Sequence, residues 1–209
     1  LTNTVWKHKP EISGDAYFAF EQIINFALKN KPDAVLCGGD IFDSSNPSDI
    51  EVKQLFNLLV KLSSQNPNLD NSIPFMYIKG NHDNNPGEGW PSVAGLSLNN
   101  IINVSNNLIE LGNARILSFN HMPRSQLLDT LPSIPDDVNV VMLHTCLKEA
   151  LGFEESYEVK LSELPAGKVP RVYLLGDIHK PYSHIDNKNK LQVYYPGSTH
   201  ALDVLQSHT

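Results

Sequence analysis

The first part of the chain shows a helix pattern followed by a strand pattern. Apolar residues are so dense from Asp15 to Asn30 that they predict a largely buried helix, which ends at Asn30-Lys31-Pro32. Ala34 to Cys37 is apolar throughout and is bounded by Pro32 and a glycine pair. Such a run is typical of an inner strand in a covered sheet.

A second helix and a second strand follow. Ser48 and Glu51 have the spacing of a capping box, which predicts a helix running to about Ser64. Phe75 to Ile78 is the next apolar run. The core face expected for the helix consists of Ile50, Leu55, Phe56, Leu58, Leu59 and Leu62. Alternating helices and strands predict an α/β layered fold.

The second half of the chain is rich in short strand patterns. The loop from Asn81 to Ser92 is too short for a domain linker, so one domain over residues 1–209 is expected. The predicted strands are Ile101 to Val104, Asn107 to Leu111, Ala114 to Phe119, Val138 to His144, Arg171 to Leu175, Tyr182 to Ile185 and Leu191 to Tyr195.

Composition narrows the class of protein. With 41% hydrophobic and 19% charged residues, the 209-residue chain is expected to fold as a globular domain. Its formal net charge of −7 argues against a simple nucleic-acid sleeve, because the chain as a whole repels a polyanion. That charge is compatible with an enzyme whose bound metal ions attract phosphate.

Cysteine usage and hydropathy suggest a location. Cys37 and Cys146 are too few for a disulfide framework and fit buried free thiols in a reducing compartment. No apolar run approaches the length of a membrane span, and the first residues do not resemble a signal peptide. We therefore expect a cytoplasmic protein, or a nuclear one in a eukaryote, that is not secreted and has no membrane partner.

Polar residues follow four of the predicted strands. They are Asp40 after the first strand, Asn81, His82 and Asp83 after the second, His144 at the end of Val138 to His144, and Asp177 with His179 after Arg171 to Leu175. The carboxyl edge of an α/β sheet is where ligand sites form. Glycines precede Asp40, Asn81 and Asp177 and would let the backbone approach a ligand closely.

These residue types suit divalent metal ions. Asp, Asn and His without Cys are ligands for Mn²⁺, Mg²⁺, Fe²⁺ or Zn²⁺. Two such ions need a bridging carboxylate, for which Asp40 is the candidate, and together they would clamp both oxygens of a phosphoryl displacement. Single residues of this kind are usually turn, cap or core residues; the repeated arrangement after four strands favours a metal site.

Together, Gly-Gly-Asp-Ile-Phe-Asp at 38–43, Gly-Asn-His-Asp at 80–83, His144 and Gly-Asp-Ile-His at 176–179 resemble the motifs of the calcineurin-like metallophosphoesterases. Further features match the SbcD-like family of DNA-repair nuclease subunits, which work with an SbcC-type ATPase on DNA ends. They are residues 14–20, Asn46-Pro47-Ser48, Lys180-Pro181 and Tyr195-Pro196-Gly197-Ser198. The resemblance implies a sandwich of two mixed β-sheets flanked by helices.

The resemblance also implies a role for each candidate. Asp40 would bridge two ions, Asn81, His144 and Asp177 would bind one of them, and His179 the other. His82 would stabilise the transition state and help protonate the leaving oxygen, and Asp83 would orient the His82 ring.

Two departures from the family pattern matter. The family has His where this chain has Asp177, so preference should move toward harder ions, and Mn²⁺ is the favoured metal. The family's first motif, Asp-x-His, which supplies two ligands, normally lies just ahead of a residue such as Leu1. We expect that the natural protein continues upstream; the alternative is a form that binds one ion well and the other poorly. The C-terminal capping and ATPase-docking regions are also absent from these 209 residues.

The expected function is a metal-dependent DNA exonuclease or endonuclease acting in end processing, with DNA, an SbcC-type ATPase and a second copy of the chain as implied partners. A small-molecule phosphodiesterase or phosphatase could use the same site. A catalytically weak scaffold that binds DNA or the ATPase is the third reading.

Other polar residues are expected to be ordinary. Asp43 is interpreted as a residue that anchors its loop, and Arg171, Lys180 and Lys190 as a weak basic edge. No site role is assigned to the remaining histidines, which are His8, His121, His184, His200 and His208.

Overall fold

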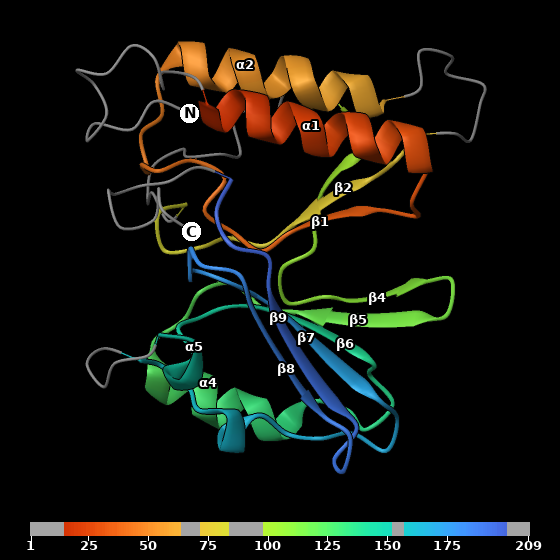
Figure 1. The fold of residues 1–209 in the computed structure, drawn as a ribbon, viewed down its shortest axis with the longest axis vertical. Helices are drawn as coiled ribbons and strands as arrows, with labels where there is room; N and C mark the ends of the chain where they lie inside the picture. Colours follow the sequence, from red (N-terminus) through yellow and green to blue (C-terminus); the bar gives the residue numbers. More distant parts are fainter. Residues whose placement is uncertain (1–14, 64–71, 84–97, 152–156, 200–209) are drawn as a thin grey trace.

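A computed structural model describes residues 15–63, 72–83, 98–151 and 157–199 of the chain (Figure 1). Two β-sheets lie between two layers of helices, with α1 and α2 on one side and α4 and α5 on the other (Figure 1). This is the predicted α/β sandwich of two sheets flanked by helices. In the described part of the chain, no helix is long and apolar enough to cross a bilayer.

The first sheet has three parallel strands in the order β1-β2-β3. Its strands are β1 (Val35–Cys37), β2 (Phe75–Tyr77) and β3 (Ile101–Asn103), covered by α1 (Asp15–Asn30), α2 (Asp49–Leu59) and the 3-10 turn η3 (Val60–Leu62). α2 begins with the predicted capping box, since the Ser48 hydroxyl accepts from the Glu51 amide and the Glu51 carboxylate accepts from the Ser48 amide.

The second sheet has six strands in the order β4-β5-β6-β7-β9-β8. They are β4 (Leu108–Leu111), β5 (Ala114–Ser118), β6 (Val140–His144), β7 (Arg171–Gly176), β8 (Tyr182–Asp186) and β9 (Leu191–Tyr195). β5, β6, β7 and β9 are parallel, whereas β4 and β8 pair antiparallel at the two edges. The carboxyl ends of β6 and β7 therefore lie side by side, with His144 opposite Gly176.

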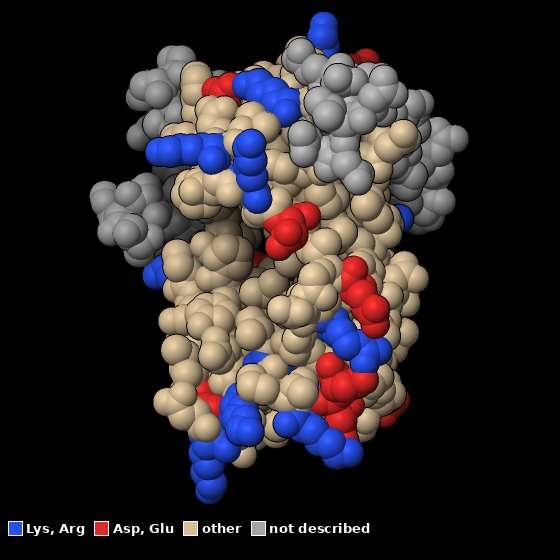
Figure 2. Space-filling view, turned by 90° about the vertical axis from the view of Figure 1, so that its right-hand side faces the viewer, with Lys and Arg blue, Asp and Glu red and all other residues tan. Residues whose placement is uncertain are grey.

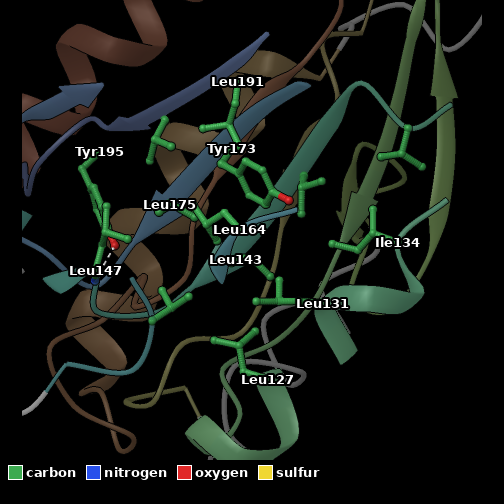
Figure 3. Close-up of a cluster of buried hydrophobic side chains, with 14 residues drawn as sticks. Leu127, Leu131, Ile134, Leu143, Leu147, Leu164, Tyr173, Leu175, Leu191 and Tyr195 are labelled. Atoms are coloured by element: carbon green, nitrogen blue, oxygen red, sulfur yellow. Dashed lines mark hydrogen bonds between the residues drawn. The ribbon is translucent and has the colours of Figure 1, made fainter. Parts of the chain in front are cut away.

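Apolar side chains fill the space between all four layers. One cluster packs the helices against the first sheet, a second contains Met76, Ile78, Ile116 and Met142 and joins the two sheets, and the third packs the second sheet against its helices (Figure 3). The cluster between the sheets brings the strand ends of both sheets to the same edge of the sandwich.

The burial predicted for α1 and α2 was partly wrong. α1 is amphipathic and not largely buried: Phe18 and Phe26 are 59% and 68% exposed. In α2, Ile50 is 69% exposed because it lies in the first turn, away from the core face that Leu55 and Leu58 form. β1 pairs with β2, and no second neighbour lies among the described strands, so the inner position expected for β1 stays a prediction.

The sequence patterns also missed short helices. These are α4 (Arg124–Thr130), α5 (Lys148–Leu151) and the 3-10 turns η4 (Leu131–Ser133) and η5 (Leu161–Glu163). Arg171 does not contribute to a basic edge: it is 1% exposed, and its guanidinium donates to the carbonyls of Pro135, Val138 and Pro165. Most of the loop predicted from Asn81 to Ser92 lies outside the described residues, and so does His200.

Candidate metal centre

The ends of four strands converge on one point, the Nε2 atom of His144. Asn81 Oδ1 lies 3.0 Å from this nitrogen, Asp40 Oδ2 3.3 Å and Asp177 Oδ1 3.6 Å. Asp40 follows β1, Asn81 follows β2, His144 ends β6 and Asp177 follows β7. Ligand atoms of Asp40, His144 and Asp177 all lie within 4.8 Å of one another. The predicted convergence of these four residues is therefore present.

The other ring nitrogen of His144 determines what Nε2 can do. Nδ1 lies 2.7 Å from the Gly38 carbonyl oxygen, which can only accept a hydrogen bond, so Nδ1 carries the proton. In the neutral ring Nε2 then presents a lone pair. A ligating histidine commonly donates its other N–H to a carbonyl in this way, which fixes the ring and its tautomer.

Electrostatics favour a cation at this point. Burial opposes the charging of His144, which is 2% exposed, but hydrogen bonds to Asp177 and Asp40 outweigh it and raise the pKa of His144 to about 10. Burial also opposes ionisation of Asp177, yet contacts with His144 and Cys146 lower its pKa. Two carboxylates, an amide oxygen and an imidazole nitrogen therefore fit a divalent cation, which would replace the positive charge of a protonated His144.

The close approach of the strand ends depends on glycine. Gly39 has φ +99°, and a Cβ there would lie 2.5 Å from His144 Nδ1. A Cβ on Gly80 would collide with Asp40 Oδ1. Asp40 and Asp177 themselves have positive φ values of 50° and 95°, a conformation that non-glycine residues rarely adopt. Both carboxylates of the site therefore sit on strained backbone.

Asp83 and His82 are placed differently from the prediction. Asp83 is buried, burial raises its pKa, and its Oδ2 accepts from the amides of Asp40 at 2.7 Å and Gly80 at 2.9 Å. His82 Nδ1 lies 2.8 Å from the Asp43 carbonyl oxygen. The expected contact between Asp83 and the His82 ring is therefore wrong, because Asp83 faces the backbone of the two loops. Asp43 anchors the ring instead, through its main chain.

A cavity of about 930 Å³ gives access to the site. Asp40, His82, Asp177 and His179 lie in its wall, together with apolar residues of α1 such as Phe20. Among the described residues His179 does not belong to the group within 4.8 Å, so its role as a ligand of a second ion stays a prediction.

A layer behind the ligands was missed by sequence reasoning. The His121 ring packs edge-on against His144, with centroids 5.9 Å apart, and its Nε2 lies 3.0 Å from Glu158 Oε1. Cys146 Sγ donates to Asp177 Oδ2 at 2.7 Å. Burial, then the Asp177 contact, raise the pKa of Cys146, so the sulfur keeps its proton. The hydrogen-bonded partners are 31 or more residues apart in sequence, and no local pattern marks them.

Comparison with known proteins identifies the class. Residues 8–181 match the calcineurin-like phosphoesterase family, so the chain belongs to that family. The match covers β1, β2, β6 and β7, the strands that supply the four converging residues.

Several archaeal proteins similar to this chain carry the same name. The chain is 28% identical over 174 residues to the DNA double-strand break repair protein Mre11 of Saccharolobus solfataricus, covering 79% of this chain and 43% of the relative. Identity to Mre11 of Archaeoglobus fulgidus is 25% over 225 residues, covering 96% of this chain and 48% of the relative. Identity to Mre11 of Methanosarcina acetivorans is 27% over 194 residues, covering 88% of this chain and 30% of the relative. The chain thus spans less than half the length of these relatives.

Proposed function

We propose that the protein is a metal-dependent DNA nuclease that hydrolyses phosphodiester bonds at DNA ends. One observation carries the proposal. Side-chain oxygens of Asp40, Asn81 and Asp177 lie close to Nε2 of the buried His144. The other ring nitrogen, Nδ1, donates to the Gly38 carbonyl oxygen. Membership of the phosphoesterase family supports phosphoester chemistry. The similarity to double-strand break repair proteins favours DNA over a small phosphoester.

The residues divide the chemistry between them. Asp40, Asn81, His144 and Asp177 would hold the ion, with Asp40 as the carboxylate shared by a second one. When bound, divalent ions supply positive charge that neutralises phosphate oxygens and activates water. Mn²⁺ is the proposed metal, since oxygen donors outnumber nitrogen in this set.

His82 is the proposed proton donor to the leaving oxygen. It is exposed in the cavity wall, and its amide donates to Asp40 Oδ1 at 2.9 Å, which keeps it beside the ligands. Because Nδ1–H donates to the Asp43 carbonyl oxygen, Nε2 is the nitrogen left to exchange a proton with a substrate.

The surface charge is consistent with DNA binding that depends on metal ions at the site. Lys and Arg side chains are mixed with Asp and Glu on the face that Figure 2 draws, and the described residues there form no continuous basic stripe. With a net charge of −7, the chain would bind DNA weakly without cations at the site.

An SbcC-type ATPase and a second copy of the chain are further proposed partners, acting in the cytoplasm or the nucleus.

The test compares substrates and variants in Mn²⁺. We expect cleavage of linear duplex DNA in preference to cyclic nucleotides, and we expect His82→Gln to lower the DNA cleavage rate by about 10²–10⁴-fold with Mn²⁺ affinity unchanged. His184→Gln in β8 is the matched control and should keep full activity. Preferential hydrolysis of cyclic nucleotides would indicate a small-molecule phosphodiesterase, and DNA binding without turnover a scaffold; either result contradicts the nuclease.

A further inference from the structure

We propose that the thiol of Cys146 positions the Asp177 carboxylate, so that this residue presents Oδ1 alone to the metal ion. The inference rests on the proposed role of Asp177 as a ligand and goes beyond it, because it assigns a function to a residue outside the group of ligand atoms that lie within 4.8 Å of one another. Asp177 lines the cavity, whereas Cys146 is not among the described residues of its wall. Cys146 would therefore act through Asp177 and not on a substrate.

The two oxygens of Asp177 have different partners. Oδ2 accepts from Cys146 Sγ at 2.7 Å, while Oδ1 faces His144 Nε2 at 3.6 Å. The terminal torsion of an aspartate is broad and roughly two-fold, so an untethered carboxylate can exchange its oxygens. A donor fixed on Oδ2 removes this freedom.

The main chain of Cys146 is held on both sides. Its amide donates to Glu158 Oε2 at 3.1 Å, and its carbonyl accepts from the amides of Glu158 at 2.9 Å and Val159 at 3.1 Å. The same Glu158 carboxylate accepts from the Thr145 hydroxyl at 2.9 Å and faces His121 at 3.0 Å. The thiol is thus presented from a backbone whose polar groups are all hydrogen-bonded.

Tyr195 fixes the residues on either side of Cys146. Its hydroxyl donates to the Thr145 carbonyl at 2.6 Å. It accepts from the Leu147 amide at 3.0 Å, as Figure 3 shows. The Thr145 amide also donates to the Gly176 carbonyl at 3.2 Å, one residue before Asp177. The residues that precede Cys146 and Asp177 are therefore hydrogen-bonded to each other, which restrains the thiol and the carboxylate relative to one another.

The other cysteine provides a comparison. Cys37 Sγ donates over a long distance, 3.8 Å, to the carbonyl of Gly39, and it has no hydrogen bond to a carboxylate in the described part of the chain. Both cysteines are free and half-buried, so replacement by Ala removes the same atoms from a similar degree of burial. A space-filling role alone would predict equal effects of their removal on metal affinity, whereas positioning predicts an effect at Cys146 only.

The experiment measures Mn²⁺ affinity by calorimetry for the wild type, Cys146→Ala, Cys146→Ser and Cys37→Ala, with the melting temperature of each metal-free protein. Removing a partner that orients a ligand typically weakens metal affinity 10–100-fold. We expect a loss of about 10-fold for Cys146→Ala, recovery to within about 3-fold for Cys146→Ser, whose hydroxyl can donate to Oδ2, and no change for Cys37→Ala.

Each outcome decides a separate question. Equal affinity of Cys146→Ala and wild type overturns the inference, as does an equal loss in Cys146→Ser and Cys146→Ala at unchanged metal-free melting temperatures. A wild type that binds no Mn²⁺ overturns the proposed metal site itself, and this result is distinct because it does not depend on Cys146.

Discussion

Single residues at the strand ends decide what the site can bind. Asp40, Asn81, His144 and Asp177 were predicted from their positions after apolar runs, and the structure brings them together. Residues that follow apolar strand patterns can be recognised as site candidates from sequence, because parallel strands end at one edge of a sheet. The supporting residues Glu158 and Cys146 were not predictable, since their partners come from distant segments and their types are common in turns and cores.

Asp83 is expected to matter for stability more than for proton transfer. Replacing it by Ala removes the acceptor of the buried Asp40 and Gly80 amides, which should lower the free energy of unfolding by about 2 kcal/mol. Urea denaturation of the metal-free protein measures this. Asp129→Ala removes an exposed carboxylate from α4 and should change stability by less than about 0.5 kcal/mol. A metal-free Asp83→Ala protein as stable as the wild type would refute the structural role.

At the scale of helices and strands, the type of an element was easier to predict than the burial of its side chains. The strands agree with prediction within about two residues because short apolar runs between turn residues are specific. Burial of α1 was overestimated, since periodicity identifies a face without saying what covers it. The seven-residue α4 was missed because it contains one buried residue, Leu127, which is too little for a periodic signal.

The contact between the strand ends predicts a strong effect of one glycine. Gly80→Ala should abolish measurable Mn²⁺ binding although it removes no ligand, because the new Cβ would displace the Asp40 carboxylate. Gly112→Ala is the control: its Cβ would meet nothing within 4 Å, while φ +57° costs about 1 kcal/mol of stability. Calorimetric titration of both variants tests this, and normal Mn²⁺ affinity in Gly80→Ala would contradict it.

At the scale of the whole molecule, the proposed ligands connect the two sheets. Asp40 and Asn81 follow strands of the first sheet, and His144 and Asp177 belong to adjacent strands of the second. An ion held by all four would link the two halves of the sandwich in addition to the apolar cluster between them.

Metal should therefore stabilise the fold. At Mn²⁺ concentrations 100 times the dissociation constant, binding to the folded state alone adds about 2.7 kcal/mol, or roughly 5–10 °C in melting temperature. EDTA should reverse the shift. Asp40→Asn should lose most of it, whereas Glu110→Gln, which changes an exposed carboxylate in β4, should retain it. An equal shift in both variants would indicate that Mn²⁺ binds elsewhere.

The most direct test of the central claim is an anomalous difference map from crystals grown with Mn²⁺. We expect a strong peak within coordination distance of Asp40, Asn81, His144 and Asp177, in place of the direct contacts of the other three side chains with His144 Nε2. Fully occupied Mn²⁺ peaks elsewhere on the molecule, with none among these four residues, would contradict it.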